Sequence, residues 1–304
     1  MSKSLDRLSL LQTFVRIADA GSISAAARTM GLSQPSVSRQ LSELESRFKA
    51  QLMRRTTHDL SLTAAGAELL ADARRILDEW EALEEKHLEA EDVLRGKLKV
   101  VVPVALGQLH LLDTVLRFQR QHPSLSVSWQ LEDQTIRFAE VGCDCWVKIG
   151  AVPDDSLIVE SLGQVERMVV AIPEFLEAHG TIKTPTDLEK LPCVALEPFE
   201  GGRIPLTNSQ GKTATVLPFV RMTTNNIFAL RKATLAGIGI SVLPRWFIEE
   251  DLQSQKLVDL LPQWRAPRLA IHVASLPGRY RPRKLQNFLE VLRAAVLEIP
   301  GIER

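Results

Sequence analysis

Residues 22–48, SISAAARTMGLSQPSVSRQLSELESRF, decide the fold of the N-terminal part of this chain. The Ala-rich run over 24–30 predicts a short helix, and Gly31 is typical of a helix C-terminus. Ser33 then offers an N-cap, and Pro35 fits the first turn of a following helix. Two helices joined by so tight a turn favour a helix-turn-helix.

The second of these helices has two unlike faces. Its apolar residues recur at i, i+4, i+7 and i+11, which places them on one side of a helix: Val37, Leu41, Leu44 and Phe48. The opposite side carries Pro35, Arg39, Ser42 and Ser46. Short donors and acceptors with one guanidinium suit base edges and phosphates in a DNA major groove, and a helix N-terminus attracts a phosphate. An amphipathic surface helix with a solvated polar face is the alternative that these residues leave open.

The flanking segments support the DNA-binding interpretation. Helical spacing predicts a first helix over 5–20, and 52–62 predicts a small β-hairpin in which Arg54 and Arg55 reach the DNA backbone as a wing. Residues 1–63 carry nine Lys and Arg against five Asp and Glu, a net +4. A basic head of this kind is expected to face an anion.

A long helix is predicted over 64–93, with Thr63 as its cap. Two rows of residues spaced by seven form an apolar seam, which indicates a dimerising rod of roughly 45 Å. The seam residues expected to pair two subunits are Leu69, Ile76, Trp80 and Leu83. Residues 64–95 carry four basic and ten acidic side chains, a net −6, so the seam is flanked by Glu and Asp.

From Lys97 onward, strands and helices alternate, which predicts an α/β fold with a parallel sheet. Helices are expected over 108–121, 173–179, 226–236 and 282–297, and strands over 165–172, 193–197, 215–222, 238–243 and 271–277, with others at KLKVVV, LSVSWQL and CDCWVKIG. The predicted domains are a head at 1–63, a linker helix at 64–95 and an α/β domain at 96–304. Its lobe I comprises 96–166 and 266–304, and its lobe II comprises 167–265.

Composition narrows the class of protein. The 304 residues are 45% apolar and 24% charged, which is ordinary for a globular protein. No apolar run approaches the ~18 residues of a membrane span, and the N-terminus lacks a signal-peptide pattern, so a cytoplasmic protein is expected. The three cysteines argue against a disulfide framework. Alternation would place Cys143, Cys145 and Val147 on one face of a strand as buried residues.

Residues 5–66 resemble the winged helix-turn-helix of LysR-type transcriptional regulators. The resemblance rests on the Ala-Ala-Ala-Arg run, LSQPSVSRQL at 32–41 and LTAAG at 62–66, with CDCWVKIG at 143–150 and ATLAGIGISVLP at 233–244 further along. It implies a winged head, a long linker helix and a two-lobed effector domain like a periplasmic solute-binding fold. It also implies a regulator that binds an operator in double-stranded DNA and responds to a small-molecule effector.

Matching positions give the DNA contacts that the resemblance implies: Ser33, Gln34, Pro35, Ser36, Ser38 and Arg39, with Arg55 as the family's wing arginine. His58 and Asp59 stand where the family often has basic residues. The implied partners are a second copy of the chain, as a homodimer or homotetramer, and RNA polymerase. No enzyme activity, cofactor or metal is expected, because no catalytic or metal-binding motif is present. No membrane contact is expected either, because no long apolar run is present. A small-molecule binding protein or enzyme of the solute-binding fold is the alternative.

The effector is expected to lie between the lobes. The expected residues are Val104, Ala105, Gly107, Gln130, Lys148, Gly150, Phe199, Thr224, Asn225 and Asn226. Many family members have Ser or Thr near 103–105 to bind a carboxylate, whereas this chain has Pro103, Val104 and Ala105. Backbone N–H groups of the following helix would then have to bind the anion. Lys148 could offer charge to the ligand, or could pair with Asp144.

Overall fold

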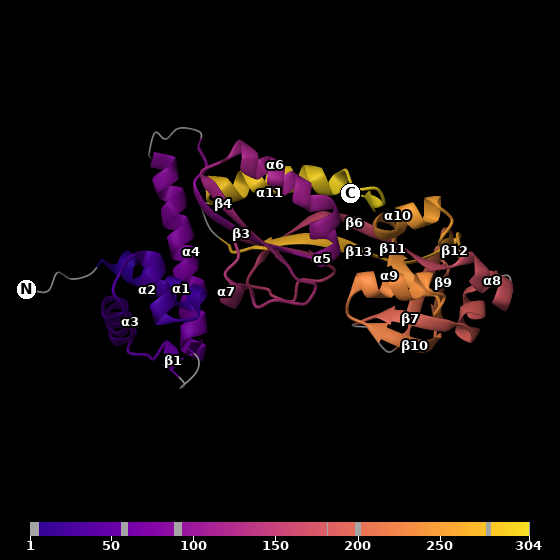
Figure 1. Cartoon of the computed structure of the whole chain (residues 1–304), viewed down its shortest axis with the longest axis horizontal. Coiled ribbons are helices and arrows are strands. Elements are labelled where there is room, and N and C mark those ends of the chain that lie inside the picture. The colour runs from indigo at the N-terminus through magenta and orange to yellow at the C-terminus, as the bar shows by residue number, and fades with distance from the viewer. Residues whose placement is uncertain are drawn as a thin grey trace, which may run out of the picture.

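The computed structural model describes residues 6–55, 60–87, 93–180, 182–197, 202–277 and 281–303. A small helical head lies beside one end of a long helix, α4 (Ala64–His87), and a two-lobed α/β domain extends away from that helix (Figure 1). The winged head, linker helix and two-lobed domain predicted from the sequence are therefore confirmed.

Three helices form the head as predicted: α1 (Arg7–Ala20), α2 (Ile23–Met30) and α3 (Gln34–Phe48). The hydroxyl of Ser22 accepts a hydrogen bond from the N–H of Ala25 and so caps α2. Gly31 ends α2 with a φ of 64°, in the left-handed region where glycine is favoured. These local signals fix the turn that separates α2 from α3.

The core of the head differs from the sequence prediction at two positions. Phe48, expected on the buried face, is 52% exposed; it is the last residue of α3, where the helix ends. Gln40 is buried instead, and its side chain is hydrogen-bonded to the hydroxyl of Thr13 on α1. This buried polar pair fixes α3 against α1 and satisfies both groups.

The predicted hairpin is present as β1 (Met53–Arg55) paired antiparallel with β2 (Leu60–Leu62). Thr63 caps α4, accepting a hydrogen bond from the N–H of Gly66 at 3.0 Å. A Cβ atom at Gly66 would lie 1.9 Å from the carbonyl oxygen of Leu52. Glycine therefore lets the wing approach the first turn of α4, which joins the head to the linker helix.

One mixed sheet runs through both lobes in the order β11-β6-β13-β5-β3-β4. Its lobe I strands are β3 (Gly96–Val102), β4 (Leu125–Leu131) and β5 (Cys145–Ile149), and the long strands β6 (Ile158–Ala171) and β13 (Trp264–Ser275) continue into lobe II. One continuous helical run comprises α5 (Val104–Leu106), a π-helical segment η1 (Gly107–Leu111) and α6 (Leu112–Gln121). This run begins four residues earlier than predicted. It covers one face of the sheet with α11 (Arg283–Leu297), while α7 (Phe138–Val141) connects β4 to β5 (Figure 1).

Lobe II is built around a parallel pair of strands, β7 (Pro192–Leu196) and β10 (Phe219–Thr224). Its remaining elements are α8 (Pro173–His179), the 3-10 helix η2 (Pro185–Lys190), β8 (Ile204–Asn208), β9 (Thr213–Val216), α9 (Ile227–Leu235), β11 (Ser241–Pro244), α10 (Arg245–Gln253) and β12 (Val258–Asp259). The final strand, β14 (Ile302–Glu303), returns to β6 in the main sheet. The strand predicted over 215–222 is thus two strands separated by Leu217 and Pro218, and the one predicted over 271–277 is the end of the much longer β13.

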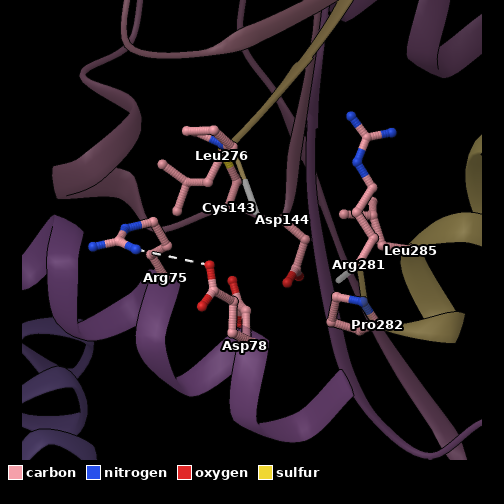
Figure 2. A pocket seen from close by; sticks show the side chains of 10 residues that line it. Arg75, Asp78, Cys143, Asp144, Leu276, Arg281, Pro282 and Leu285 are labelled. Carbon is pink, nitrogen blue, oxygen red and sulfur yellow. Dashed lines mark ion pairs between the residues drawn. The ribbon is translucent and has the colours of Figure 1, made fainter. Parts of the chain in front are cut away.

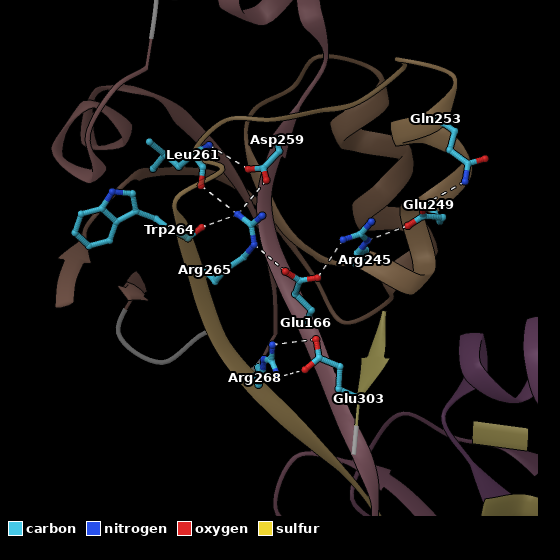
Figure 3. Close-up of polar contacts among 10 residues, drawn as sticks. All are labelled: Glu166, Arg245, Glu249, Gln253, Asp259, Leu261, Trp264, Arg265, Arg268 and Glu303. Atoms are coloured by element: carbon cyan, nitrogen blue, oxygen red, sulfur yellow. Dashed lines mark hydrogen bonds and ion pairs between the residues drawn. The ribbon is translucent and has the colours of Figure 1, made fainter. Parts of the chain in front are cut away.

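Ion pairs tie the two long crossing strands to each other and to lobe II (Figure 3). Glu166 on β6 accepts from Arg265 on β13 at 2.9 Å and also pairs with Arg245 on α10 at 3.6 Å. Arg265 pairs in turn with Asp259 at 3.0 Å. This network joins the two strands to α10 and β12 at the point where they enter lobe II.

Candidate DNA interface and effector site

The N-terminal half of α3 presents the predicted DNA-contact residues to solvent. Ser33, Gln34, Pro35 and Arg39 are exposed, and Ser36 and Ser38 are half-buried. The Ser33 hydroxyl accepts from the N–H of Ser36 at 3.4 Å, so it acts as the N-cap. Arg39 has no hydrogen-bond or ion-pair partner among the described residues, whereas Arg47 is paired with Glu43 at 2.6 Å. The Arg39 guanidinium, on the exposed side of α3, is therefore available to a ligand.

The wing lies beside this face. Arg54 on β1 is exposed, and the backbone of Arg55 pairs with Leu60, while the Arg55 side chain and residues 56–59, including His58 and Asp59, lie outside the described residues. Glu45 on α3 accepts from the backbone N–H groups of Leu52 and Met53 at 2.9 and 3.3 Å. Sequence reasoning missed this role of Glu45, because nothing in the spacing distinguishes it from a solvated acid.

The seam of α4 is an exposed apolar strip. Ile76, Trp80 and Leu83 are 39%, 44% and 37% exposed, although all three are large apolar side chains. Leu69 is half-buried against the core of the head. Ala73, which belongs to the same heptad pattern, is fully buried within the chain and so does not extend the strip. The strip available to a partner is therefore the distal half of the predicted seam.

In lobe I, the first turn of the 104–121 helical run already holds a carboxylate. Asp133 accepts a hydrogen bond from the backbone N–H of Val104 at 2.9 Å. Burial raises the pKa of Asp133 from its ordinary value, while this hydrogen bond lowers it. The helix N-terminus that was expected to attract an effector's anionic group is thus capped by a side chain of the chain itself.

The neighbouring lobe I candidates divide into packing residues and accessible ones. Ala105 is buried, and a Cβ at Gly107 would lie 2.1 Å from Val102 Cγ2, so Gly107 serves close packing. Gln130 is exposed. Gly150 has a φ of 92°, and its carbonyl accepts from His272 Nδ1 at 2.8 Å. Open space surrounds the position that a Gly150 side chain would occupy.

Lys148 does not form the ion pair with Asp144 that was considered from the sequence. Its Nζ donates to the backbone carbonyl of Asp133 at 2.9 Å and lies 5.7 Å from the centre of the Trp146 ring. Asp144 instead accepts from the backbone N–H of Lys99 at 2.6 Å. Burial lowers the pKa of Lys148, opposed by Asp133 and Glu132. Lys148 therefore supports the same loop whose carboxylate caps the helix.

In lobe II, two of the predicted effector residues also shape the backbone. Asn226 is the N-cap of α9, its side-chain oxygen accepting from the N–H of Ala229 at 3.1 Å. The Thr224 hydroxyl accepts from the N–H of Asn226 at 3.2 Å, which leaves its own proton free for an acceptor. Asn225 between them is exposed, and Phe199 lies outside the described residues. Trp246 on α10 meets His110 on η1 with ring centroids 5.3 Å apart, so the lobes touch through this pair.

The three cysteines are buried in the core. Burial raises the pKa of Cys143 and of Cys193 to about 12 and also raises that of Cys145, which keeps the thiols protonated and unreactive. The predicted sharing of one strand face was wrong for Cys143. It precedes β5 and packs with Trp146, whereas Cys145 and Val147 pack on the sheet's other face. Within the described residues, no three His, Cys, Asp or Glu side chains gather as a metal site.

Comparison with known proteins gives the family. A model of bacterial regulatory helix-turn-helix proteins of the lysR family matches residues 8–67, and a model of the LysR substrate binding domain matches residues 91–297. This chain belongs to the LysR family of transcriptional regulators. The HTH-type transcriptional regulator PtxR of Pseudomonas aeruginosa is 30% identical over 298 residues, covering 96% of each chain.

Solved LysR-type regulators share the fold. ArgP from Mycobacterium tuberculosis superimposes with a TM-score of 0.70 at 20% identity, covering 99% of both chains. The full-length regulator LysG from Corynebacterium glutamicum, solved with arginine bound as its effector, gives 0.68 at 18% identity over 96% of this chain and 99% of its own. The protein described here is accordingly a DNA-binding LysR-type transcriptional regulator with an effector-binding domain. In the described part of the chain, no helix is long and apolar enough to cross a bilayer.

Proposed function

We propose that α3 enters the major groove through its N-terminal half and that the wing contacts the neighbouring backbone. The DNA-contact residues in this proposal are Ser33, Gln34, Pro35, Ser36, Ser38, Arg39, Arg54 and Arg55. The observation that carries it is the exposed, unpaired guanidinium of Arg39 beside a capped helix N-terminus. Residues 1–63 form the reading head, 64–95 the linker and 96–304 the effector domain, in which lobe I comprises 96–166 and 266–304 and lobe II comprises 167–265.

Sequencing of genomic fragments retained by the purified protein tests this proposal. We expect a short two-fold motif among the retained fragments, because two identical heads would read two half-sites. Affinity for that motif is expected to fall steeply with salt, since phosphate contacts release counterions. Retention of random fragments, with no recurring motif at any salt concentration, would favour the alternative of a binding protein or enzyme of the solute-binding fold.

The partners follow from the same proposal. Two α4 strips pair to give a homodimer, which can assemble further into a homotetramer, and the DNA-bound assembly contacts RNA polymerase. Leu69, Ile76, Trp80 and Leu83 carry the pairing, chiefly through the three exposed side chains. Because the protein acts on operator DNA, we place it in the cytoplasm, as a regulator without an enzymatic reaction.

For the effector, we propose a site between Val104, Lys148 and Gly150 of lobe I and Thr224 and Asn225 of lobe II. Ala105, Gly107, Gln130, Phe199 and Asn226 complete the proposed surroundings. An effector carboxylate aimed at the N–H of Val104 must displace Asp133, which now occupies that donor. Neutral ligands, and cations that Asp133 can pair with, meet no such competition. Asp133 therefore favours a neutral or cationic effector over an acid.

Thermal-shift screening with matched sets of acid, amide and amine tests this site. We expect amides and amines to stabilise the wild-type protein more than the corresponding acids. Asp133→Ala should raise the affinity for acids by at least roughly tenfold, because the Val104 N–H is freed. It should also lower stability by about 0.5–2 kcal/mol, the usual cost of a lost cap. Glu132→Ala is the matched control, since that carboxylate is exposed and contacts Gln134 instead.

The lobe II half of the site is tested with the best ligand from that screen. Thr224→Val is expected to weaken binding by about 1–3 kcal/mol, because a ligand acceptor would lose its donor. Thr223→Val is the control, since Thr223 is exposed next to it. Equal ligand affinity in Thr224→Val and wild type, measured by calorimetry, would place the effector elsewhere.

A further inference from the structure

The face of α4 opposite the exposed strip packs against lobe I, and two carboxylates lie close together there. Asp78 on α4 and Asp144, just before β5, line a small hollow between the linker helix and the lobe (Figure 2). The hollow measures about 20 Å³, enough for one water molecule. Neither carboxylate is needed for DNA reading or effector binding as described above.

Each cationic side chain around this pair forms an ion pair or a hydrogen bond with another residue. Lys284 on α11 donates to Glu81 on α4 at 2.7 Å, and Arg74 pairs with Asp19. Arg75 pairs with Asp72 at 3.2 Å and Glu79 at 3.7 Å, and Arg281 pairs with Glu160 at 2.7 Å. Lys99 donates to the carbonyl of Val141. The charged and titratable groups facing Asp78 and Asp144 are therefore Asp19, Arg74, Arg75, Glu79, Glu81, Lys99, Cys143, Arg281 and Lys284.

Asp78 is the member of this carboxylate pair that has no hydrogen-bond or ion-pair partner among the described residues. Asp144, by contrast, accepts the backbone N–H of Lys99. Burial raises the pKa of Asp78 to about 7; the Asp144 and Glu81 carboxylates raise it as well, whereas Lys284 and Arg74 lower it. Burial also raises the pKa of Asp144. Two like charges so placed cannot both ionise without cost.

We propose that the Asp78–Asp144 pair is a proton-binding switch that controls how firmly the linker helix sits on lobe I. With one proton on the pair, the hollow contains a single negative charge, which the nearby cations Lys284 and Arg74 stabilise although each is also paired with another acid. When that proton leaves, two facing carboxylates repel each other across the junction. Proton loss therefore weakens the packing of α4 on lobe I, and proton binding strengthens it.

The junction is connected to the DNA-reading head through Arg74. This side chain pairs with Asp19 on α1 and packs over Gly142 of lobe I, where a Cβ would lie 1.7 Å from the guanidinium carbon. One arginine, one turn from Asp78, thus touches the head, the linker and lobe I together. When α4 packs less firmly on lobe I, the contact of Arg74 with the head changes as well. DNA affinity therefore becomes dependent on pH. Only this last step relies on the proposed DNA-binding function.

Melting of the full-length protein between pH 5.5 and 8.5 tests the switch. The folded state has the higher pKa, so its extra stability is complete below the ordinary Asp value and is lost as pH rises through about 7. We expect the wild-type melting temperature to fall by roughly 5 °C or more over this range. Asp78→Asn should flatten that dependence and should melt higher than wild type at pH 8.5. Glu68→Gln is the matched control, an exposed acid on the same helix outside this cluster, and should keep the wild-type slope.

Two further measurements keep the proposal testable if a variant folds poorly. Carboxyl-carbon NMR of the wild-type chain should show one Asp titrating near pH 7, and titration of every Asp below pH 5 would overturn the proposal. Hydrogen exchange in α4 should accelerate between pH 6 and 8 beyond the intrinsic rate change in wild type but not in Asp78→Asn. If the melting temperature of Asp78→Asn depends on pH as steeply as that of the wild type, the switch is also overturned. If the affinity for retained DNA fragments does not depend on pH, only the connection between the switch and the head is removed.

Discussion

Trp80→Glu is expected to leave the protein monomeric at low micromolar concentration. Trp80 lies between Ile76 and Leu83 on the exposed strip of α4, and a two-fold interface would bring the same strip of both subunits together. The substitution would place two carboxylates in that interface, among the acids that already flank it. A central aromatic residue typically contributes at least about 2 kcal/mol, so two copies predict a roughly thousandfold weaker dimer.

Light scattering over a dilution series measures this effect. Trp80→Phe is the matched variant, and it should remain dimeric because it keeps a large apolar side chain at the same place. Circular dichroism should be alike for both variants, because an exposed side chain contributes little to the fold of one subunit. A dimer that survives Trp80→Glu at micromolar concentration would contradict the strip as the pairing surface.

The head of the protein was predictable because local signals determine it. Gly31 ends one helix and Ser33 begins the next, so the turn could be placed from a few neighbouring residues. The spacing of Val37, Leu41 and Leu44 likewise gave the buried face, since a helix converts spacing directly into direction. The prediction that Phe48 is buried was wrong for a related reason. Periodicity gives the direction in which a side chain points, but it does not show whether a neighbouring element covers that side chain.

The contacts that couple the parts of the molecule were not predictable. Glu81 and Lys284 are separated by 203 residues in sequence, and Asp78 meets Asp144 only because α4 docks on lobe I. In the same way, Asp133 caps a helix that begins 29 residues earlier. Each of these residues reads as an ordinary charged surface residue in the sequence, since spacing contains no information about which element will be packed beside it.

Those contacts also distinguish three surfaces on one helix. The strip of Ile76, Trp80 and Leu83 faces away from the chain, Asp78 faces lobe I, and Arg74 reaches the head. Because all three surfaces belong to one helix, a change in how α4 packs on lobe I would affect the pairing strip and the head together. A proton signal at Asp78 would therefore act on the pairing strip and on the head through the same helix.

Arg39→Ala is expected to abolish preference for the operator while leaving the fold intact. Arg39 is exposed on the groove-facing side of α3, and no described residue pairs with it, so its removal costs little packing. A bidentate arginine contact to a guanine contributes about 1–3 kcal/mol of discrimination. Each half-site would lose a factor of about 5 to 150, and a dimer would lose it twice.

Arg47→Ala provides the matched control on the same helix. Arg47 lies at the C-terminal end of α3 and is paired with Glu43, so its loss should weaken binding to all sequences equally, if at all. Gel-shift titrations against the retained operator and a scrambled duplex separate the two variants. We expect Arg39→Ala to bind both duplexes with similar affinity, and Arg47→Ala to keep the ratio of the wild type. A wild-type ratio in Arg39→Ala, with normal circular dichroism, would show that another side chain of the head reads the bases.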